Sequence, residues 1–223
     1  MPLELALMEE EDAPAFATID GLAMADWPIG RAMVLAMSGT GETRHDVIER
    51  WYRQGFRNDS ELVWLKVTDT GLGGEIIACA LWRYHLDGAG PKIEAPRTTQ
   101  EGASATKTPE TEPEPKVTIW TALDRAWGEF REEFIGSKPH ANLQICIAHP
   151  KHQRRGAGSM LVQWGCDKAD KRGLMSVLQS SAAGLRLYQK HGFTIVKQST
   201  MDLRPYGVDE TELRRSMMRP AKG

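Results

Sequence analysis

The sequence contains no apolar run approaching the about 20 residues that a membrane-spanning helix needs. Its formal net charge of −2 provides no excess of positive charge to favour nucleic acid or an anionic membrane surface. The first residues, Met1–Glu4, have neither the basic region nor the apolar stretch of a secretory signal. We therefore predict a protein that works with no nucleic-acid partner and no membrane.

Cysteine is also scarce, with Cys79, Cys146 and Cys166 only. An odd number without the spacing of a disulfide framework predicts reduced thiols inside the cell. We expect all three to be small residues of the core. The predicted location is the cytoplasm, with the nucleus as the alternative.

The length and composition favour a single domain. The 223 residues are 41% hydrophobic and 26% charged, which is close to globular norms. The stretch 87–116 differs, because it is rich in Gly, Pro, Thr and Glu and has almost no large apolar residues. We predict one domain over residues 1–223, with a flexible insert at 87–116. Ordering of this insert over a ligand is the alternative.

Hydrophobic periodicity predicts alternating strands and helices. Strands are expected at 3–8, 62–67, 75–84, 143–148, 174–178, 193–197 and 216–218. The second and third of these flank a Gly-rich turn and form a predicted hairpin. Helices are expected from Pro14 onward, from a capping box at Thr43 and Asp46, and over 121–134.

The most informative segment is 143–196, where a strand leads through a glycine-containing turn into a helix. The turn is Gln153–Gly158, and the helical pattern starts directly after it. A helix N-terminus has unpaired N–H groups and a partial positive charge, and glycine lets an anion approach the backbone. These features predict a phosphate site, to which Arg154 and Arg155 add charge and Ser159 adds a hydroxyl. An ordinary strand-to-helix turn is the alternative.

Two better-known phosphate loops do not fit this turn. It lacks the Gly-Lys-Ser/Thr ending of a nucleoside-triphosphate loop. It also lacks the first glycine of the dinucleotide fingerprint and an acidic residue about 20 positions further on. Neither a nucleoside triphosphate nor NAD is therefore favoured.

The segment resembles a known family. Ile145–Pro150 followed by Gln153–Gly158 is similar to motif A of the GCN5-related N-acetyltransferases. Ala182–Leu185 and then Leu187–Phe193 are similar to motif B, in the expected order. The segment is also similar in shape to many fungal members. The resemblance implies an α/β (α+β) fold: a mixed, largely antiparallel central sheet, splayed at the motif A strand, with helices on both faces.

The resemblance further implies acetyl-CoA as the acyl-donor cosubstrate and no metal. The pyrophosphate would bind over the turn, and the pantetheine arm would pair with the backbone of the motif A strand. A backbone N–H of that strand would polarise the thioester carbonyl. The cofactor-binding residues implied in this way are Cys146, Ile147, Ala148, Gln153, Arg154, Arg155, Gly156, Ala157, Gly158 and Ser159.

Tyr188 matches the family position whose phenol lies near the CoA sulfur. The resemblance implies a general acid there, because a tyrosine with a pKa of about 10 is protonated at neutral pH. A tyrosine packed in the core is the alternative. The general base is not identified: Asp124, Glu75, His85 and a water chain remain candidates. A zinc site at Cys146, His149 and His152 is disfavoured, because no fourth ligand is evident.

The function implied is transfer of an acetyl group to a primary amine by direct attack on the thioester. A small-molecule acceptor is preferred, because no peptide-recognition module is apparent outside the core. The alternatives are a protein or peptide N-acetyltransferase, and an acyl-CoA-binding regulatory protein without turnover. A homodimer is left open.

Overall fold

The computed structural model describes residues 2–38, 41–87 and 118–222. The predicted insert 87–116 lies outside these residues apart from Asp87. None of the helices in the described ranges has the length and apolar character that crossing a bilayer requires.

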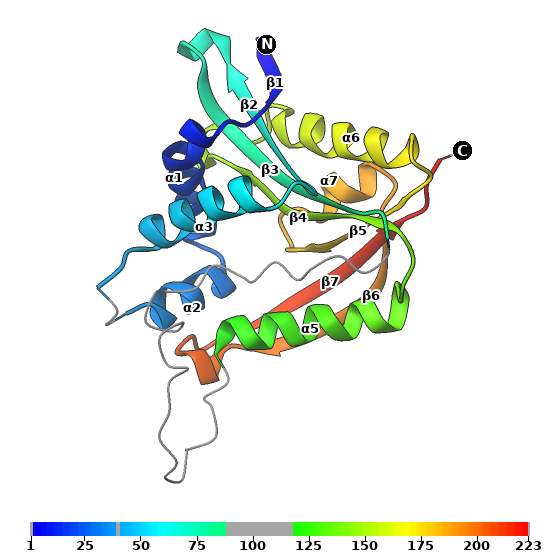
Figure 1. Cartoon of the computed structure of the whole chain (residues 1–223). Helices are drawn as coiled ribbons and strands as arrows, with labels where there is room; N and C mark the ends of the chain where they lie inside the picture. The colour runs from blue at the N-terminus through cyan, green and yellow to red at the C-terminus, as the bar shows by residue number, and fades with distance from the viewer. Residues whose placement is uncertain (1, 39–40, 88–117, 223) are drawn as a thin grey trace.

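The described residues form a single seven-stranded sheet in the order β1-β2-β3-β4-β5-β7-β6 (Figure 1). Only β4 and β5 pair in parallel, so the predicted mixed, largely antiparallel sheet is confirmed. The strands are β1 (Leu3–Leu7), β2 (Leu62–Asp69), β3 (Glu75–His85), β4 (His140–Ala148), β5 (Met175–Ser180), β6 (Thr194–Asp202) and β7 (Thr211–Arg219).

In the part of the chain that the structure describes, six α-helices cover the two faces of this sheet. They are α1 (Ala13–Met24), α2 (Pro28–Ala36), α3 (Arg44–Asn58), α5 (Ile119–Phe134), α6 (Ala157–Asp170) and α7 (Leu185–Lys190). The predicted capping box is present, since the Thr43 hydroxyl accepts from Asp46 N–H and the Asp46 carboxylate accepts from Thr43 N–H. The described residues also form short 3-10 turns: η1 (Glu10–Asp12), η2 (Thr70–Leu72), η3 (Pro150–His152) and η4 (Arg204–Tyr206).

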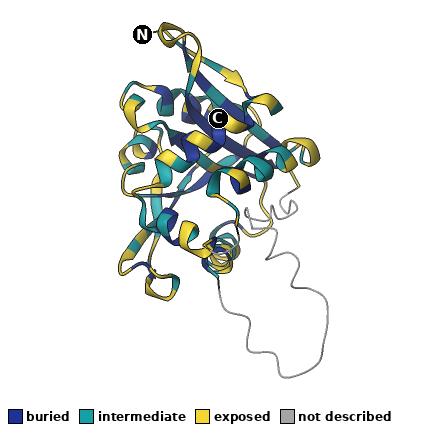
Figure 2. Cartoon of the chain, turned by 90° about the vertical axis from the view of Figure 1, so that its left-hand side faces the viewer, coloured by how far each residue is buried: buried dark blue, intermediate teal, exposed yellow. Residues whose placement is uncertain are grey.

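The alternation of side chains along β3 shows how the faces divide. Trp82 and Tyr84 pack with α6 on one face, whereas Cys79 and Leu81 pack with α1 and α3 on the other. On this second face α5 covers the sheet further along, through a cluster that contains Val177 of β5. The buried residues follow the strands, and the exposed ones lie on the outer sides of the helices (Figure 2).

Two predicted strands at the C-terminal end were too short. The strand expected at 193–197 runs on to Asp202, and the one expected at 216–218 begins at Thr211. The two strands pair with each other over this added length. Their exposed, polar outer residues hide the apolar alternation on which the prediction depended.

A close helix-to-sheet approach fixes α6 against β3. A Cβ on Gly165 would lie 1.9 Å from Trp82 Cε2, so only glycine fits there. The indole Nε1 of Trp82 donates to the Leu161 carbonyl at 3.3 Å. This contact sets where α6 lies, and therefore where its N-terminal turn meets β4.

Candidate active site

The β4–β5 ladder stops part-way along the sheet. Pairing runs from His140 with Met175 to Leu143 with Leu178, although β4 continues to Ala148. The register of β3 with β4 shifts at the same level, which leaves Gln144 without an opposite residue. The irregularity turns β4 away from β5, and the predicted splay is confirmed.

The part of β4 that has left β5 contains the three residues predicted to meet the pantetheine arm. Cys146, Ile147 and Ala148 pair with β3 on one side. On the other side the ladder to β5 has ended, so their outward N–H and C=O groups need other partners. Cys146 packs with the cluster around α6, and Ile147 packs with the cluster around α1 and α3.

The predicted phosphate turn follows directly. The His149 side chain accepts from Lys151 N–H at 3.2 Å and so shapes η3. Arg154 (φ 62°) and Gly156 (φ 99°) then adopt left-handed conformations. Helix α6 begins at the next residue, and Met160 N–H donates to Gly156 C=O at 3.1 Å. The N–H groups ahead of Met160, from Ala157 to Ser159, have no acceptor within the helix, as an anion site requires.

The Arg155 side chain has a partner within the protein. It forms an ion pair with Asp69, which is 2% exposed at the end of β2, and its Nη1 lies 3.1 Å from His152 Nδ1. The Arg155 guanidinium holds the pKa of the Asp69 carboxyl below its usual range. The Arg155 side chain thus ties the turn to the end of β2. The Arg154 side chain is exposed.

Ser159 is also engaged. Its hydroxyl lies 2.8 Å from His191 Nε2, and His191 Nδ1 lies 3.1 Å from Gln163 Oε1. Burial lowers the pKa of His191, so the ring is neutral at physiological pH. Since Gln163 Oε1 only accepts, we assign the ring proton to Nδ1, and Nε2 then accepts from the Ser159 hydroxyl. The backbone N–H of Ser159 remains for an anion.

Tyr188 lies directly beside the part of β4 that no longer pairs with β5. Its hydroxyl is hydrogen-bonded to the Cys146 thiol, and its ring is 8% exposed. A Cβ on Gly184 would lie 2.7 Å from the ring, so glycine leaves the space that Tyr188 occupies. Burial raises the pKa of Tyr188 and raises that of Cys146 to about 12. Both groups therefore carry protons at neutral pH, which suits a proton donor and disfavours a thiolate nucleophile.

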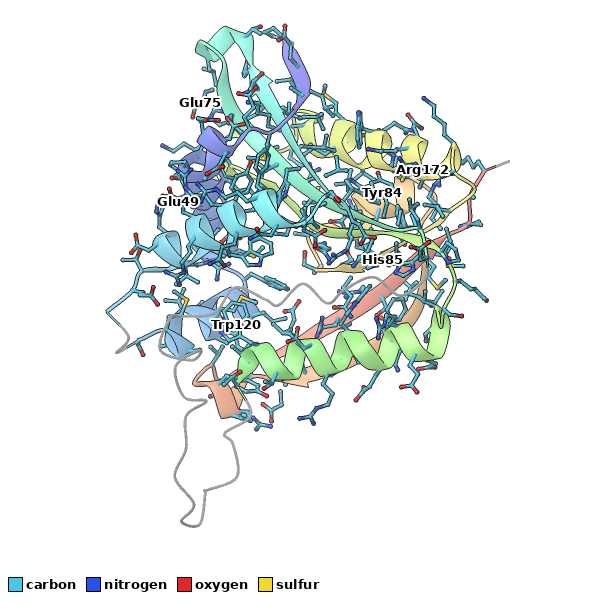
Figure 3. All side chains as sticks on the ribbon, viewed as in Figure 1. Glu49, Glu75, Tyr84, His85, Trp120 and Arg172 are labelled. Carbon is cyan, nitrogen blue, oxygen red and sulfur yellow. The ribbon has the colours of Figure 1, made fainter. Side chains whose placement is uncertain are left out.

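None of the named base candidates lies at this centre. His85 stacks on His140 with ring centroids 4.4 Å apart, six strand residues or about 20 Å from Cys146. Burial lowers the pKa of His85 to about 4. Glu75 lies at the opposite end of β3 from His85 (Figure 3), and both Glu75 and Asp124 are exposed. In the described ranges no three metal-ligating side chains gather into a site.

Sequence reasoning missed three residues that support the site. Asp69 anchors the turn, His191 orients Ser159, and Gly184 makes room for Tyr188. Asp69 lies 86 positions from its partner, so no local pattern indicates the pairing. Gly184 lies in motif B, but its contact with the Tyr188 ring becomes apparent only in the folded structure.

The chain matches the model of the acetyltransferase (GNAT) family over residues 31–193, more than half of its length and including both motifs. The chain belongs to the GNAT family. It is an acetyl-CoA-dependent N-acetyltransferase by that membership, with the mixed, splayed sheet of the family. No curated protein is similar enough in sequence to match it.

Solved GNAT structures share the fold at low sequence identity. Arylalkylamine N-acetyltransferase 2 from Aedes aegypti superposes with a TM-score of 0.64 at 12% identity, and the match covers 100% of each chain. A Corynebacterium glutamicum protein described as histone acetyltransferase HPA2 and related acetyltransferase gives 0.61 at 14%, covering 100% of this chain and 98% of that one. The yncA protein of Salmonella typhimurium, solved with acetyl-CoA, gives 0.55 at 14%, covering 100% and 95%. The predicted similarity to fungal members is not confirmed.

The Asp69 ion pair predicts a pH dependence of stability. A carboxyl whose pKa is lowered in the folded state stabilises it above the unfolded pKa of about 3.9, and this contribution is lost as pH falls through the folded value. Asp69→Asn should therefore lower the free energy of unfolding at pH 7 and flatten its decline below about pH 4. Urea unfolding monitored by tryptophan fluorescence from pH 2.5 to 7 measures both effects.

Asp202→Asn is the matched control. The pKa of Asp202 is also lowered, but its partner Arg204 is only two residues away and exposed. Its substitution should change little. If the free energy of unfolding of the two variants depended on pH in the same way, Asp69 would not anchor the turn.

Proposed function

We propose that this GNAT protein transfers the acetyl group of acetyl-CoA to a primary amine of a small molecule by direct attack on the thioester. The observation that supports this best is the contact between the Tyr188 hydroxyl and Cys146, in the part of β4 that no longer pairs with β5. There a proton donor lies beside backbone groups that are free to bind the donor substrate.

The cofactor would lie along residues already described. The N–H groups at the start of α6, with those of Gln153 to Gly156, would bind the pyrophosphate. The open edge of β4 from Cys146 to Ala148 would pair with the amides of the pantetheine arm. This placement is supported by the left-handed turn at Arg154 and Gly156 and by the end of the β4–β5 ladder. Acetyl-CoA supplies the activated acyl group.

The reaction then needs one proton donor and one oxyanion partner from the protein. The neutral amine attacks the thioester carbonyl carbon, and a β4 N–H stabilises the charge that forms on oxygen. As the C–S bond breaks, Tyr188 gives its proton to the sulfur. The amide nitrogen loses its extra proton to water, and the phenolate is reprotonated.

The small-molecule acceptor and the cytoplasmic location are parts of the same proposal. Structural neighbours include an enzyme named for arylalkylamines and one named for the alanine of ribosomal protein S18, so the fold serves both kinds of acceptor. We prefer the small molecule because no peptide-recognition module accompanies the core. The cysteines, all unpaired, are consistent with the cytoplasm.

Tyr188→Phe tests the proton donor. We expect kcat to fall about 10²- to 10⁴-fold, the usual contribution of a positioned acid, with little change in the Kd for CoA. Thiol release from acetyl-CoA with a panel of amines measures kcat, and calorimetry measures Kd. Full kcat across the pH range would remove Tyr188 from the mechanism.

Tyr84→Phe is the control for that variant. Tyr84 is also buried, and its hydroxyl donates to Gly165 C=O at 3.2 Å on the same face of the sheet. It should lose about 1 kcal/mol of stability and keep its kcat. Tight CoA binding without turnover of any amine by the wild type would instead favour a binding protein.

Gly156→Val tests the phosphate turn. Gly156 has φ 99°, where a side chain strains the backbone, and its position is at the start of the proposed anion site. We expect the Kd for CoA to rise at least about tenfold, which corresponds to about 1.4 kcal/mol. Gly136→Val is the control, because Gly136 (φ 61°) has the same backbone constraint beyond α5. If both variants bind CoA like the wild type, the turn does not bind the pyrophosphate.

A further inference from the structure

Polar side chains form a strip on the sheet face that α1, α3 and α5 cover. On this face Val177 of β5 packs with α5, and its ladder partner Met218 of β7 packs against the same cluster. Side chains two residues apart on a strand share a face. Gln179 therefore lies on the same face as Val177, and Ser216 and Arg214 lie on the same face as Met218. The polar strip consists of Asn142 of β4, Gln179 of β5, and Arg214 and Ser216 of β7.

Arg214 is the charged member of the polar strip. Its Nη2 donates to Gln179 Oε1, whereas its Nη1 is buried with no hydrogen-bond partner. In the described ranges no carboxylate forms a salt bridge with it. The nearby Glu212 instead accepts from Trp27 Nε1 at 3.0 Å. Burial lowers the pKa of Arg214 to about 10, which still leaves it charged at neutral pH.

A largely buried guanidinium without an ion pair is costly, because the charge has lost much of its water. Glu212 offsets this charge without forming a salt bridge with it. The other members of the strip also carry hydrogen-bond donors. Asn142 and Ser216 are at most 6% exposed, and their side chains bond to no described residue. Since Gln179 accepts through Oε1, its amide N–H groups also remain as donors. Gln179 and Ser216 therefore place donors next to the one cation of the strip.

The polar strip lies beside the open part of β4. The β4–β5 ladder ends at Leu143 and Leu178, and Ser180 pairs with Arg215 of β7. Arg214 is therefore level with Cys146 along the sheet, on the other side of β5 and of the gap that opens between β4 and β5. It lies on the face opposite Tyr188, whose cluster contains Leu178 and Met217. An acceptor approaching the thioester from that face would pass the strip.

We propose that Arg214 and Gln179 bind a carboxylate of the acceptor, so that the substrate class is an amine that also carries a carboxylate, such as an α-amino acid. This inference rests on the proposed acetyltransferase function and specifies its acceptor. A planar guanidinium binds a carboxylate through two parallel N–H groups, and Nη1 is the unpaired one here. The amine of the same molecule then faces the gap beside Cys146.

The first test uses the wild type with matched acceptors: phenylalanine against 2-phenylethylamine, and alanine against ethylamine. Each pair differs only in the carboxylate. Thiol release should give a kcat/KM at least about tenfold higher for the amino acid, the usual effect of a hydrogen bond to a charged group. An equal or higher value for the plain amine overturns the inference. This comparison requires no variant.

The second test separates binding from structure. Arg214→Met should raise KM for the amino acid about 10- to 100-fold with kcat and the KM for the plain amine unchanged, and Arg214→Lys should recover part of the loss. Arg215→Met is the control, because Arg215 is the next residue on β7 and points to the opposite face. Equal losses for both acceptors would make Arg214 a structural tie between β7 and β5 and would contradict the inference.

The carboxylate site and the acetyltransferase function are overturned by different results. Acetylation of plain amines alone would overturn the carboxylate site and leave the acetyltransferase function intact. No CoA release with either acceptor class would overturn the proposed function, and this inference with it.

Discussion

The end of the β4–β5 ladder after Leu143 is the constraint on which the candidate site depends. A parallel pair that continued to Ala148 would satisfy the outward N–H and C=O groups of β4 within the protein, and no edge would remain for a ligand. Buried backbone groups are nearly always paired, so an interior strand that loses its neighbour needs another partner. The shifted register between β3 and β4 produces the interruption locally, and the other pairs of the sheet hold the strands on either side of it.

The surrounding parts follow from this opening. Helix α6 is held against β3 at Gly165 and Trp82, which brings its free N–H groups to the end of β4. The Asp69–Arg155 ion pair holds the turn between them to the end of β2. Helix α7 places the Tyr188 hydroxyl on Cys146, where burial keeps it protonated. The polar strip lies on the opposite face, so donor and acceptor substrates would meet at the gap from different sides.

Local signals predicted much of this from the sequence. The glycines after β4 predicted the turn into α6, and motifs A and B together predicted the family, the fold and the splay. The lengths of β6 and β7 were not predicted, because their outer residues are polar and exposed. The sequence also did not predict the partners of Arg155 and Ser159, or that Nη1 of Arg214 lacks one. Those contacts join positions that come together only when the whole sheet forms.

The central claim is that the open edge of β4 and Tyr188 together hold the thioester. A crystal structure with CoA measures this most directly. We predict that the pantetheine arm pairs with the backbone of Cys146 to Ala148 and that the Tyr188 hydroxyl leaves the Cys146 thiol to bond the CoA sulfur at about 3.0 to 3.5 Å, a hydrogen-bond contact. A CoA molecule bound away from this edge, or a sulfur beyond reach of Tyr188 with its hydroxyl still on Cys146, would contradict the account.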